Sequence, residues 1–189
     1  MPDVIPTEFT QMRRALSYPL YKTALEKAAQ DFLFHTVEGS PFPLAQFEGR
    51  LLLIVNTATE CYFTRQLDEL QRLWCAYQMK GLTVIGVPCD DFGGQSPGTD
   101  AEIFRFHAQR YEVDFPVVAR EVARGDDAHP FFLWMREALG AQSRPRWNFH
   151  KYLISPEGKP VAFFPSYVRP MSRRMIEAIE EHLPRTRPL

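Results

Sequence analysis

The feature that most constrains the fold is a pair of continuously apolar runs separated by a helical pattern. The first run, LLLIVNT, covers residues 51–57, and the second, LTVIGVP, covers residues 82–88. Unbroken apolar runs of this length are typical of strands buried on both faces, whereas half-buried strands alternate. Between the two runs, leucines recur at helical spacing over residues 64–81. The sequence therefore predicts a β-α-β crossover inside a layered α/β fold.

Further elements are predicted on both sides of this crossover. Residues 1–30 combine prolines with a helical pattern near their end, and we interpret them as an N-terminal extension packed on a single domain, residues 31–189. Asp100 is expected to cap the helix that follows it. The other expected elements are a small hairpin from residue 31, helices at 101–111, 129–139 and 171–183, a strand or loop at 115–121, and a hairpin around 156–158.

Composition excludes several classes of function. The chain has 189 residues, 45% of them hydrophobic, which is enough for one good core. Its 22 basic and 23 acidic side chains give a net charge of −1, so no overall field attracts nucleic acid or a membrane surface. Neither a signal-like segment nor an apolar run of membrane-spanning length is present, and a cytoplasmic location is expected. Three cysteines are too few for a disulfide framework.

Cys61 is the leading candidate for a reactive side chain in this fold. It follows a buried strand and precedes a helix, where free backbone N–H groups and the positive helix end favour a thiolate. The thiolate is the form that attacks. Because free cysteines are among the most buried residues and are mostly inert, a structural role is the alternative. Cys61 and Thr64 have the spacing of a Cys-x-x-Cys pair without its second thiol, which argues against a dithiol reductase.

Three polar side chains are candidate partners of this thiol. Gln95 follows two glycines in the loop after the second strand, and Trp147 and Asn148 precede a later apolar run. Loops at the carboxyl ends of neighbouring strands converge on one site in a doubly wound sheet. Amide and indole N–H groups are donors suited to a negative sulfur or oxygen. The alternatives are a solvated loop position for Gln95 and a core position for Trp147.

The remaining candidate groups predict no further chemistry. Cys75 and Cys89 are interpreted as buried structural thiols, the second because two acidic neighbours disfavour its thiolate. The five histidines lack the spacing of a metal site, and no glycine-rich nucleotide motif is present. No metal and no other cofactor is therefore expected.

Three segments together resemble the glutathione peroxidase family. LLLIVNTATECYFT (51–64) resembles its nucleophile motif, GVPCDDFGGQSPGT (86–99) its glutamine loop, and RWNFHKYLI (146–154) its Trp-Asn motif. The similarity runs from about Asp31 to the C-terminus. It implies a thioredoxin-like α/β fold, a central mixed β-sheet flanked by helices, with the N-terminal hairpin and helical extension added.

The resemblance also implies a reaction and a set of catalytic residues. In that family a cysteine or selenocysteine attacks the peroxide while glutamine, tryptophan and asparagine side chains hydrogen-bond the chalcogen. The matching residues are Cys61, Gln95, Trp147 and Asn148. The implied partners are a peroxide substrate and a thiol reductant, either glutathione or a thioredoxin-type protein. The sulfur would pass through a sulfenic acid.

Several positions depart from the family pattern. Tyr62 stands where glycine usually follows the nucleophile and is expected to narrow access or strain the turn. Asp90 and Asp91 replace Asn-Gln and would oppose a thiolate if they point inward. The helix after the glutamine loop has no resolving cysteine, so reduction directly by a thiol, or through an intermolecular disulfide, is expected. A short segment before Trp147 implies a monomer or loose dimer.

Two functions from different classes remain open at this point. The first is a thiol-dependent peroxidase that consumes hydrogen peroxide or organic hydroperoxides. The second is a redox sensor or binding protein on the same fold, in which Cys61 is oxidised once with little turnover. Tyr62 and the missing resolving cysteine favour considering the sensor.

Overall fold

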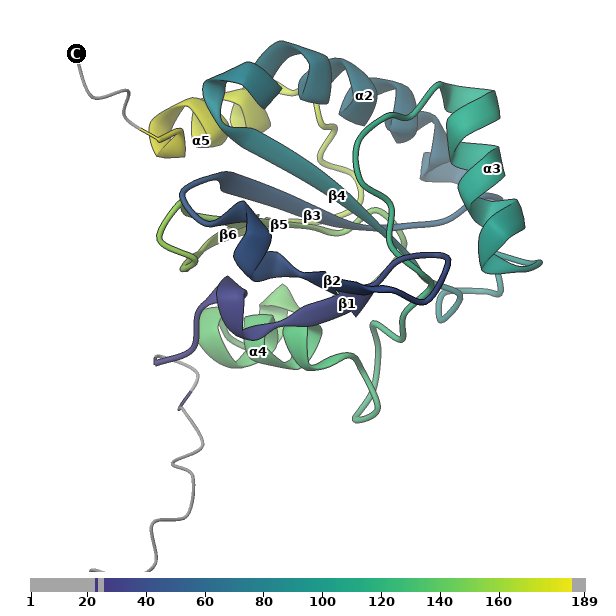
Figure 1. Ribbon diagram of the computed structural model, residues 1–189, viewed down its shortest axis with the longest axis horizontal. Helices are drawn as coiled ribbons and strands as arrows, with labels where there is room; N and C mark the ends of the chain where they lie inside the picture. Colours follow the sequence, from purple (N-terminus) through teal and green to yellow (C-terminus); the bar gives the residue numbers. More distant parts are fainter. Residues whose placement is uncertain (1–22, 24–25, 185–189) are drawn as a thin grey trace, which may run out of the picture.

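A four-stranded mixed sheet lies at the centre of the molecule (Figure 1). The computed structural model describes residues 23 and 26–184. Its strands follow the order β4-β3-β5-β6, and a separate two-stranded hairpin, β1-β2, packs beside them. The strands are β1 Leu33–His35, β2 Pro41–Pro43, β3 Leu51–Thr57, β4 Leu82–Pro88, β5 Lys151–Ile154 and β6 Pro160–Phe164; the α-helices are α2 Gln66–Tyr77, α3 Asp100–Tyr111, α4 Pro130–Leu139 and α5 Arg173–His182.

The predicted crossover forms the middle of the sheet. β3 and β4 run parallel, from Leu51 opposite Leu82 to Thr57 opposite Pro88, and every residue of both strands is buried. β5 pairs antiparallel with β3 on the other side, and β6 completes the sheet. The continuous apolar runs thus correspond to strands covered on both faces. The predicted hairpin around residues 156–158 joins β5 to β6.

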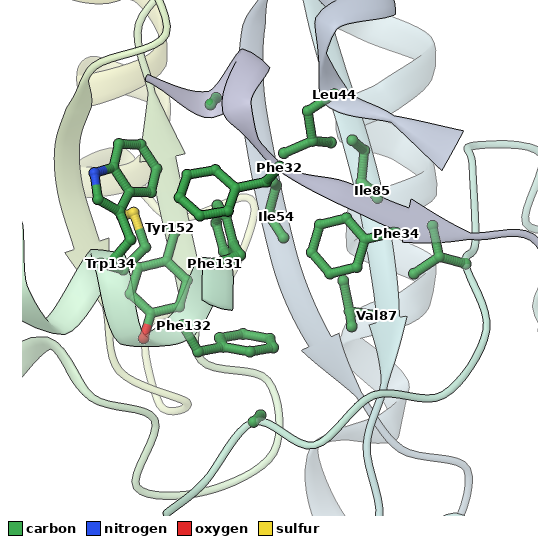
Figure 2. Packing of buried hydrophobic residues seen from close by; sticks show 14 of the residues in the cluster. Phe32, Phe34, Leu44, Ile54, Ile85, Val87, Phe131, Phe132, Trp134 and Tyr152 are labelled. Carbon is green, nitrogen blue, oxygen red and sulfur yellow. The ribbon is translucent and has the colours of Figure 1, made fainter. Parts of the chain in front are cut away.

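Helices cover both faces of the sheet (Figure 1). On one face, α2 and α5 pack over the odd-numbered leucines of β3. On the other, α4 and the β1-β2 hairpin enclose an aromatic core that Figure 2 shows from close by. Its largest members include Phe34, Phe131, Trp134 and Tyr152, all fully buried. The expected mixed sheet flanked by helices is confirmed.

Two local expectations need correction. Residues 64–81 are not one helix, because short 3₁₀ turns at Tyr62–Arg65 and Gln78–Lys80 flank α2. α3 is capped by Thr99, whose hydroxyl accepts from the amide of Glu102, so Asp100 is its first residue. Of the two alternatives expected for residues 115–121, the loop is confirmed, and it touches β4 through one isolated bridge. Most of the helical pattern predicted near the end of the extension lies outside the described residues.

Within residues 23 and 26–184, no helix is long and apolar enough to cross a membrane.

Candidate active site

Cys61 lies at the turn between the buried strand β3 and helix α2. It is the capping residue of the 3₁₀ turn, and its Sγ accepts a hydrogen bond from the amide of Phe63 at 3.5 Å. Its own amide donates to Oγ1 of Thr64 at 2.9 Å, and that hydroxyl donates to the carbonyl of Ala58 at 3.0 Å. Backbone N–H groups of this kind stabilise negative sulfur. The local hydrogen bonds therefore hold the thiol in one position.

The thiol is 9% exposed and opens into a pocket of about 820 Å³. The expected obstruction by Tyr62 is not observed, because this side chain lines the rim of an open pocket and is 90% exposed. The turn is also unstrained at Tyr62, since among the described non-glycine residues only Glu112 and Phe149 have positive φ. The pocket lining comprises Thr59, Cys61, Tyr62, Phe63, Thr64, Arg65, Gln66, Glu69, Tyr111, Tyr167 and Arg169.

The glutamine loop is joined directly to the loop that carries the thiol. The backbone carbonyl of Gln95 accepts hydrogen bonds from the amides of Thr59 at 3.0 Å and Glu60 at 2.9 Å. Gly93 and Gly94 have φ values of 80° and 62°, so the tight turn before Gln95 needs residues that adopt this conformation freely. The two loops after β3 and β4 therefore meet, as their parallel strands predict.

Asn148 contacts the Gln95 side chain. Its Nδ2 donates to Oε1 of Gln95 at 2.9 Å and to the carbonyl of Phe92 at 3.3 Å, and Asn148 is fully buried. Both hydrogens of that amide nitrogen are thereby engaged. The Gln95 amide nitrogen donates no hydrogen bond to any residue in the described part of the chain. Asn148 therefore orients Gln95, and Gln95 retains a free donor.

Trp147 lies at the rim of the site and is not a core residue. It is 41% exposed, and its ring packs against Phe92 with centroids 6.2 Å apart. A Cβ added at Gly93 would lie 3.7 Å from both the Trp147 ring and the Gln95 side chain. Across residues 23 and 26–184, no hydrogen bond joins Cys61 Sγ to Gln95, Trp147 or Asn148. The four predicted residues thus gather on joined loops without direct bonds to sulfur.

Asn56 was not predicted, yet it holds the Trp-Asn segment in place. Its backbone carbonyl accepts from the amide of Phe149 at 2.7 Å, and its Oδ1 accepts from the amide of His150 at 2.8 Å. Its Nδ2 donates to the carbonyl of Trp147 at 3.2 Å. Phe149 has φ of 64°, a left-handed conformation that costs a non-glycine residue about 1–2 kcal/mol. These bonds stabilise the turn that aims Asn148 at Gln95.

Lys151 supports the same turn from within the core. It is fully buried, and its Nζ donates to the carbonyl of Phe149 at 2.7 Å. Burial lowers the pKa of Lys151 to about 7, with an opposing effect from the Glu69 carboxylate. A polar residue inside each of two apolar runs, Asn56 in the first strand and Lys151 in a later one, was the available signal. Buried polar groups require partners, and those partners identify the turn.

Asp90 and Asp91, the acidic residues that depart from the family pattern, accept hydrogen bonds from backbone amides of loops. Asp90 accepts from the amide of Ser96 at 2.7 Å, and Asp91 accepts from the amides of Ala123 at 2.6 Å and Arg124 at 3.0 Å. Neither carboxylate hydrogen-bonds Cys61. Both carboxylates therefore bond backbone amides of their own or a neighbouring loop, and their expected opposition to a thiolate at Cys61 stays a prediction.

The other two cysteines differ from each other. Cys89 is buried as predicted, and burial raises the pKa of its thiol to about 12. Cys75 was predicted to be buried but is exposed on α2, where its sulfur faces Gln71. The apolar helix face instead comprises Leu67, Leu70 and Leu73. All three cysteines are free thiols.

Two of the buried histidines, His107 and His150, bond or contact neighbouring protein groups. His107 bonds Thr57 and the carbonyl of Ile103, and burial lowers its pKa. Burial and the neighbouring Lys151 lower the pKa of His150 to about 4. In the described part of the chain, no group of three His, Cys, Asp or Glu side chains is placed to hold a metal ion.

Comparison with known proteins finds a matching family and similar sequences. A sequence profile of the family described as glutathione peroxidase matches residues 29–136. The hydroperoxy fatty acid reductase gpx1 of Synechocystis is 40% identical over 147 residues, covering 74% of this chain and 87% of the relative. The glutathione peroxidase-like peroxiredoxin HYR1 of Saccharomyces cerevisiae is 38% identical over 149 residues, covering 77% and 90%.

A solved structure agrees with these sequence matches. The crystal structure of Trgpx in its apo form superposes with a TM-score of 0.64 at 31% identity, covering 82% of this chain and 96% of the other. The thioredoxin-like fold predicted from the sequence is confirmed by this agreement.

Proposed function

The chain belongs to the glutathione peroxidase family, whose activity is thiol-dependent reduction of peroxides, and we propose that Cys61 is the thiol that attacks the peroxide. The observation that carries this proposal is the joining of the two strand-end loops. The carbonyl of Gln95 accepts two amides of the Cys61 loop, and Asn148 holds the Gln95 side chain. The loop after β4 also carries Cys89, but that thiol is fully buried, whereas Cys61 lines the open pocket.

The proposed reaction begins at the Cys61 sulfur. The thiolate attacks the nearer peroxide oxygen, an S–O bond forms, and the O–O bond breaks. The sulfur becomes a sulfenic acid, and the leaving oxygen takes a proton to give water or an alcohol. The free amide N–H of Gln95, assisted by the rim indole of Trp147, would stabilise the negative charge as it moves from sulfur to oxygen. Asn148 would fix the orientation of Gln95.

Return of the thiol requires two equivalents of an external thiol. The first condenses with the sulfenic acid, releasing water and forming a mixed disulfide, and the second displaces Cys61 as a thiol. Cys89 is buried and Cys75 lies on the exposed surface of α2, and neither forms a disulfide. We propose glutathione or a thioredoxin-type protein as the reductant, acting directly on Cys61.

The sensor alternative differs from the enzyme in turnover alone. A sensor would consume one equivalent of peroxide and stop, whereas the enzyme would continue while reductant lasts. The absence of a cysteine from α3 is the observation that favours the sensor. The exposed Tyr62 no longer supports it, because the ring leaves the pocket open.

Steady-state peroxide consumption tests the proposal directly. The wild-type protein should turn over cumene hydroperoxide repeatedly with glutathione or with a thioredoxin system. Cys61→Ser should abolish this activity, because a serine hydroxyl is not oxidised by peroxide. Cys75→Ser is the matched control and should keep the wild-type rate. An unchanged rate in Cys61→Ser would overturn the assignment, and a single stoichiometric burst in the wild type would favour the sensor.

Three broader statements are also proposals. A cytoplasmic location is consistent with the free thiols. A monomer or loose dimer is proposed from the short segment between α4 and Trp147. The boundary near residue 30 is a proposal too, and the packing of the extension on the domain is supported by Ala29, which is buried and whose amide donates to the carbonyl of Gly158 at 2.9 Å.

A further inference from the structure

The peptide bond between Gln95 and Ser96 joins the glutamine loop to the loop that carries the thiol. Its carbonyl, that of Gln95, accepts from the amides of Thr59 at 3.0 Å and Glu60 at 2.9 Å. Its N–H, that of Ser96, donates to Oδ1 of Asp90 at 2.7 Å. A trans peptide directs its C=O and N–H to opposite sides. Asp90 and the thiol loop therefore hold one peptide plane from its two ends.

All three polar groups of Ser96 have partners. The residue is fully buried, and its Oγ donates to the carbonyl of Cys89 at 2.9 Å. Its carbonyl accepts from Nη1 of Arg120 at 3.0 Å, and its N–H takes the Asp90 carboxylate. Buried polar groups require such partners. Removal of the Asp90 carboxylate would leave the buried Ser96 amide without its acceptor, while the other two bonds remain.

Asp90 also closes the turn that leads to Gln95. Its backbone carbonyl accepts from the amide of Gly94 at 3.3 Å, so both its backbone and its side chain bond the far arm of the turn. A hydrogen bond from an amide to an ionised carboxylate is shorter and about twice as strong as one between neutral groups. The family pattern has asparagine at this position, whose oxygen can accept without the charge.

The placement of the Gln95 side chain depends on this peptide. Gly93 and Gly94 precede Gln95, and both are exposed and lack a side chain that could pack. The chain before Gln95 therefore contributes no packing that would fix it. The fixed points are Nδ2 of Asn148, which donates to Oε1 of Gln95 at 2.9 Å, and the bonded peptide that follows. Loss of the bond to Asp90 would free one of these points.

We infer that Asp90 is a positioning residue for the reaction, whose carboxylate holds the Gln95–Ser96 peptide so that the Gln95 amide stays aimed at the reacting atoms. The inference rests on the proposed function of Cys61 and Gln95. Asp90 touches neither the sulfur nor the peroxide in this role and acts through Gln95. A position that departs from the family pattern thus gains a task inside the active site.

Amide hydrogen exchange, measured by NMR, tests the placement without any turnover. In Asp90→Ala, the amides of Thr59 and Glu60 should exchange faster by about tenfold or more, as expected from the loss of one charge-assisted hydrogen bond. Asp90→Asn keeps an acceptor oxygen and should stay within about threefold of the wild type. The amides of β3 report global unfolding and separate it from the local effect.

Glu102→Ala is the matched control for this exchange measurement. It also removes a carboxylate that accepts a loop amide, that of Thr99 at 2.8 Å, but at the start of α3. The exchange of Thr59 and Glu60 should be unchanged in it. Equal exchange in the wild type and Asp90→Ala, or an equal increase in Glu102→Ala, overturns the inference.

A double-mutant cycle then tests whether Asp90 acts through Gln95. The kcat/KM for hydrogen peroxide, measured by stopped flow per folded molecule, should fall about tenfold in Asp90→Ala and recover to within about threefold of the wild type in Asp90→Asn. In the Gln95→Ala background, Asp90→Ala should cost less than about twofold, because the side chain that it positions is absent.

Two kinetic results overturn the inference: a full loss in the Gln95→Ala background, and an Asp90→Asn rate as low as that of Asp90→Ala. A wild type that consumes no peroxide would contradict the proposed function instead. The exchange measurement still decides in that case whether Asp90 holds the peptide.

Discussion

At the scale of single residues, the site assigns different tasks to its two amides. Asn148 is fully buried, and its Nδ2 donates hydrogen bonds to Oε1 of Gln95 and to the carbonyl of Phe92. Gln95 is half-buried, with its oxygen bound and its nitrogen free. A donor already oriented before the reaction stabilises developing charge without reorganisation. We therefore assign the direct contact with the reacting atoms to Gln95 and the positioning role to Asn148.

Removal of the Gln95 side chain tests this division. Gln95→Ala should lower kcat/KM for hydrogen peroxide by roughly 10²–10³-fold, the usual effect of losing one charge-stabilising donor. Gln71→Ala removes a glutamine on α2 that bonds Asp114 and should retain the wild-type rate. Stopped-flow measurement of peroxide reduction gives both constants. A Gln95→Ala rate within twofold of the wild type would contradict the assignment.

At the scale of elements, the turn after Asn148 is held from two neighbouring strands. Asn56 in β3 bonds the backbone of Trp147, Phe149 and His150, and Lys151 in β5 bonds the carbonyl of Phe149. The left-handed Phe149 persists because its amide and its carbonyl both have buried partners. The geometry of the site thus depends on the sheet beneath it.

Asn56→Ala should weaken both the fold and the reaction. The change leaves the carbonyl of Trp147 and the amide of His150 without their partners, which costs roughly 1–3 kcal/mol for each group that remains buried. Urea unfolding should show the loss of stability, and the peroxide rate per folded molecule should also fall. Thr83→Ala removes a buried hydroxyl on β4 that accepts from Arg50, away from the site. It should reduce stability and leave the rate per folded molecule unchanged, and equal rate losses would refute the positioning role of Asn56.

Lys151→Met should remove a pH-dependent component of stability. The pKa of Lys151 falls from its ordinary value of 10.5 to about 7 in the folded protein, mainly through burial. Between these values the unfolded chain binds the proton more tightly, so the free energy of unfolding rises with pH. The wild type should gain stability relative to Lys151→Met as urea unfolding is repeated from pH 7 to pH 10. A difference that stays constant would show that Lys151 keeps an ordinary pKa.

At the scale of the whole molecule, the sequence predicted the architecture well because its strongest pattern was unambiguous. Two unbroken apolar runs with a helix between them have few arrangements, and the structure places them as parallel neighbours, β3 and β4. That pairing also brings Cys61 and Gln95 together, since both follow these strands. The hairpins and α4 followed from turn residues and helical spacing in the same way.

The errors came from features that depend on packing between distant segments. Cys75 was placed on the buried side of α2 and Trp147 was weighed as a core residue, yet both are exposed. Helical spacing alone does not tell which flank of a helix meets solvent. Asn56 escaped notice because its partners lie about 90 residues away, in the turn at residues 147–150, and Lys151 because its partner is a carbonyl freed by the irregular turn at Phe149.

Trapping of the oxidised sulfur tests the central claim most directly. The protein is treated with one equivalent of hydrogen peroxide in the presence of dimedone, which modifies sulfenic acids, and the labelled cysteine is identified by peptide mass spectrometry. The account predicts a label at Cys61, with Cys75 and Cys89 unmodified, and none in Cys61→Ser. A label confined to Cys75, or one that survives Cys61→Ser, would contradict it.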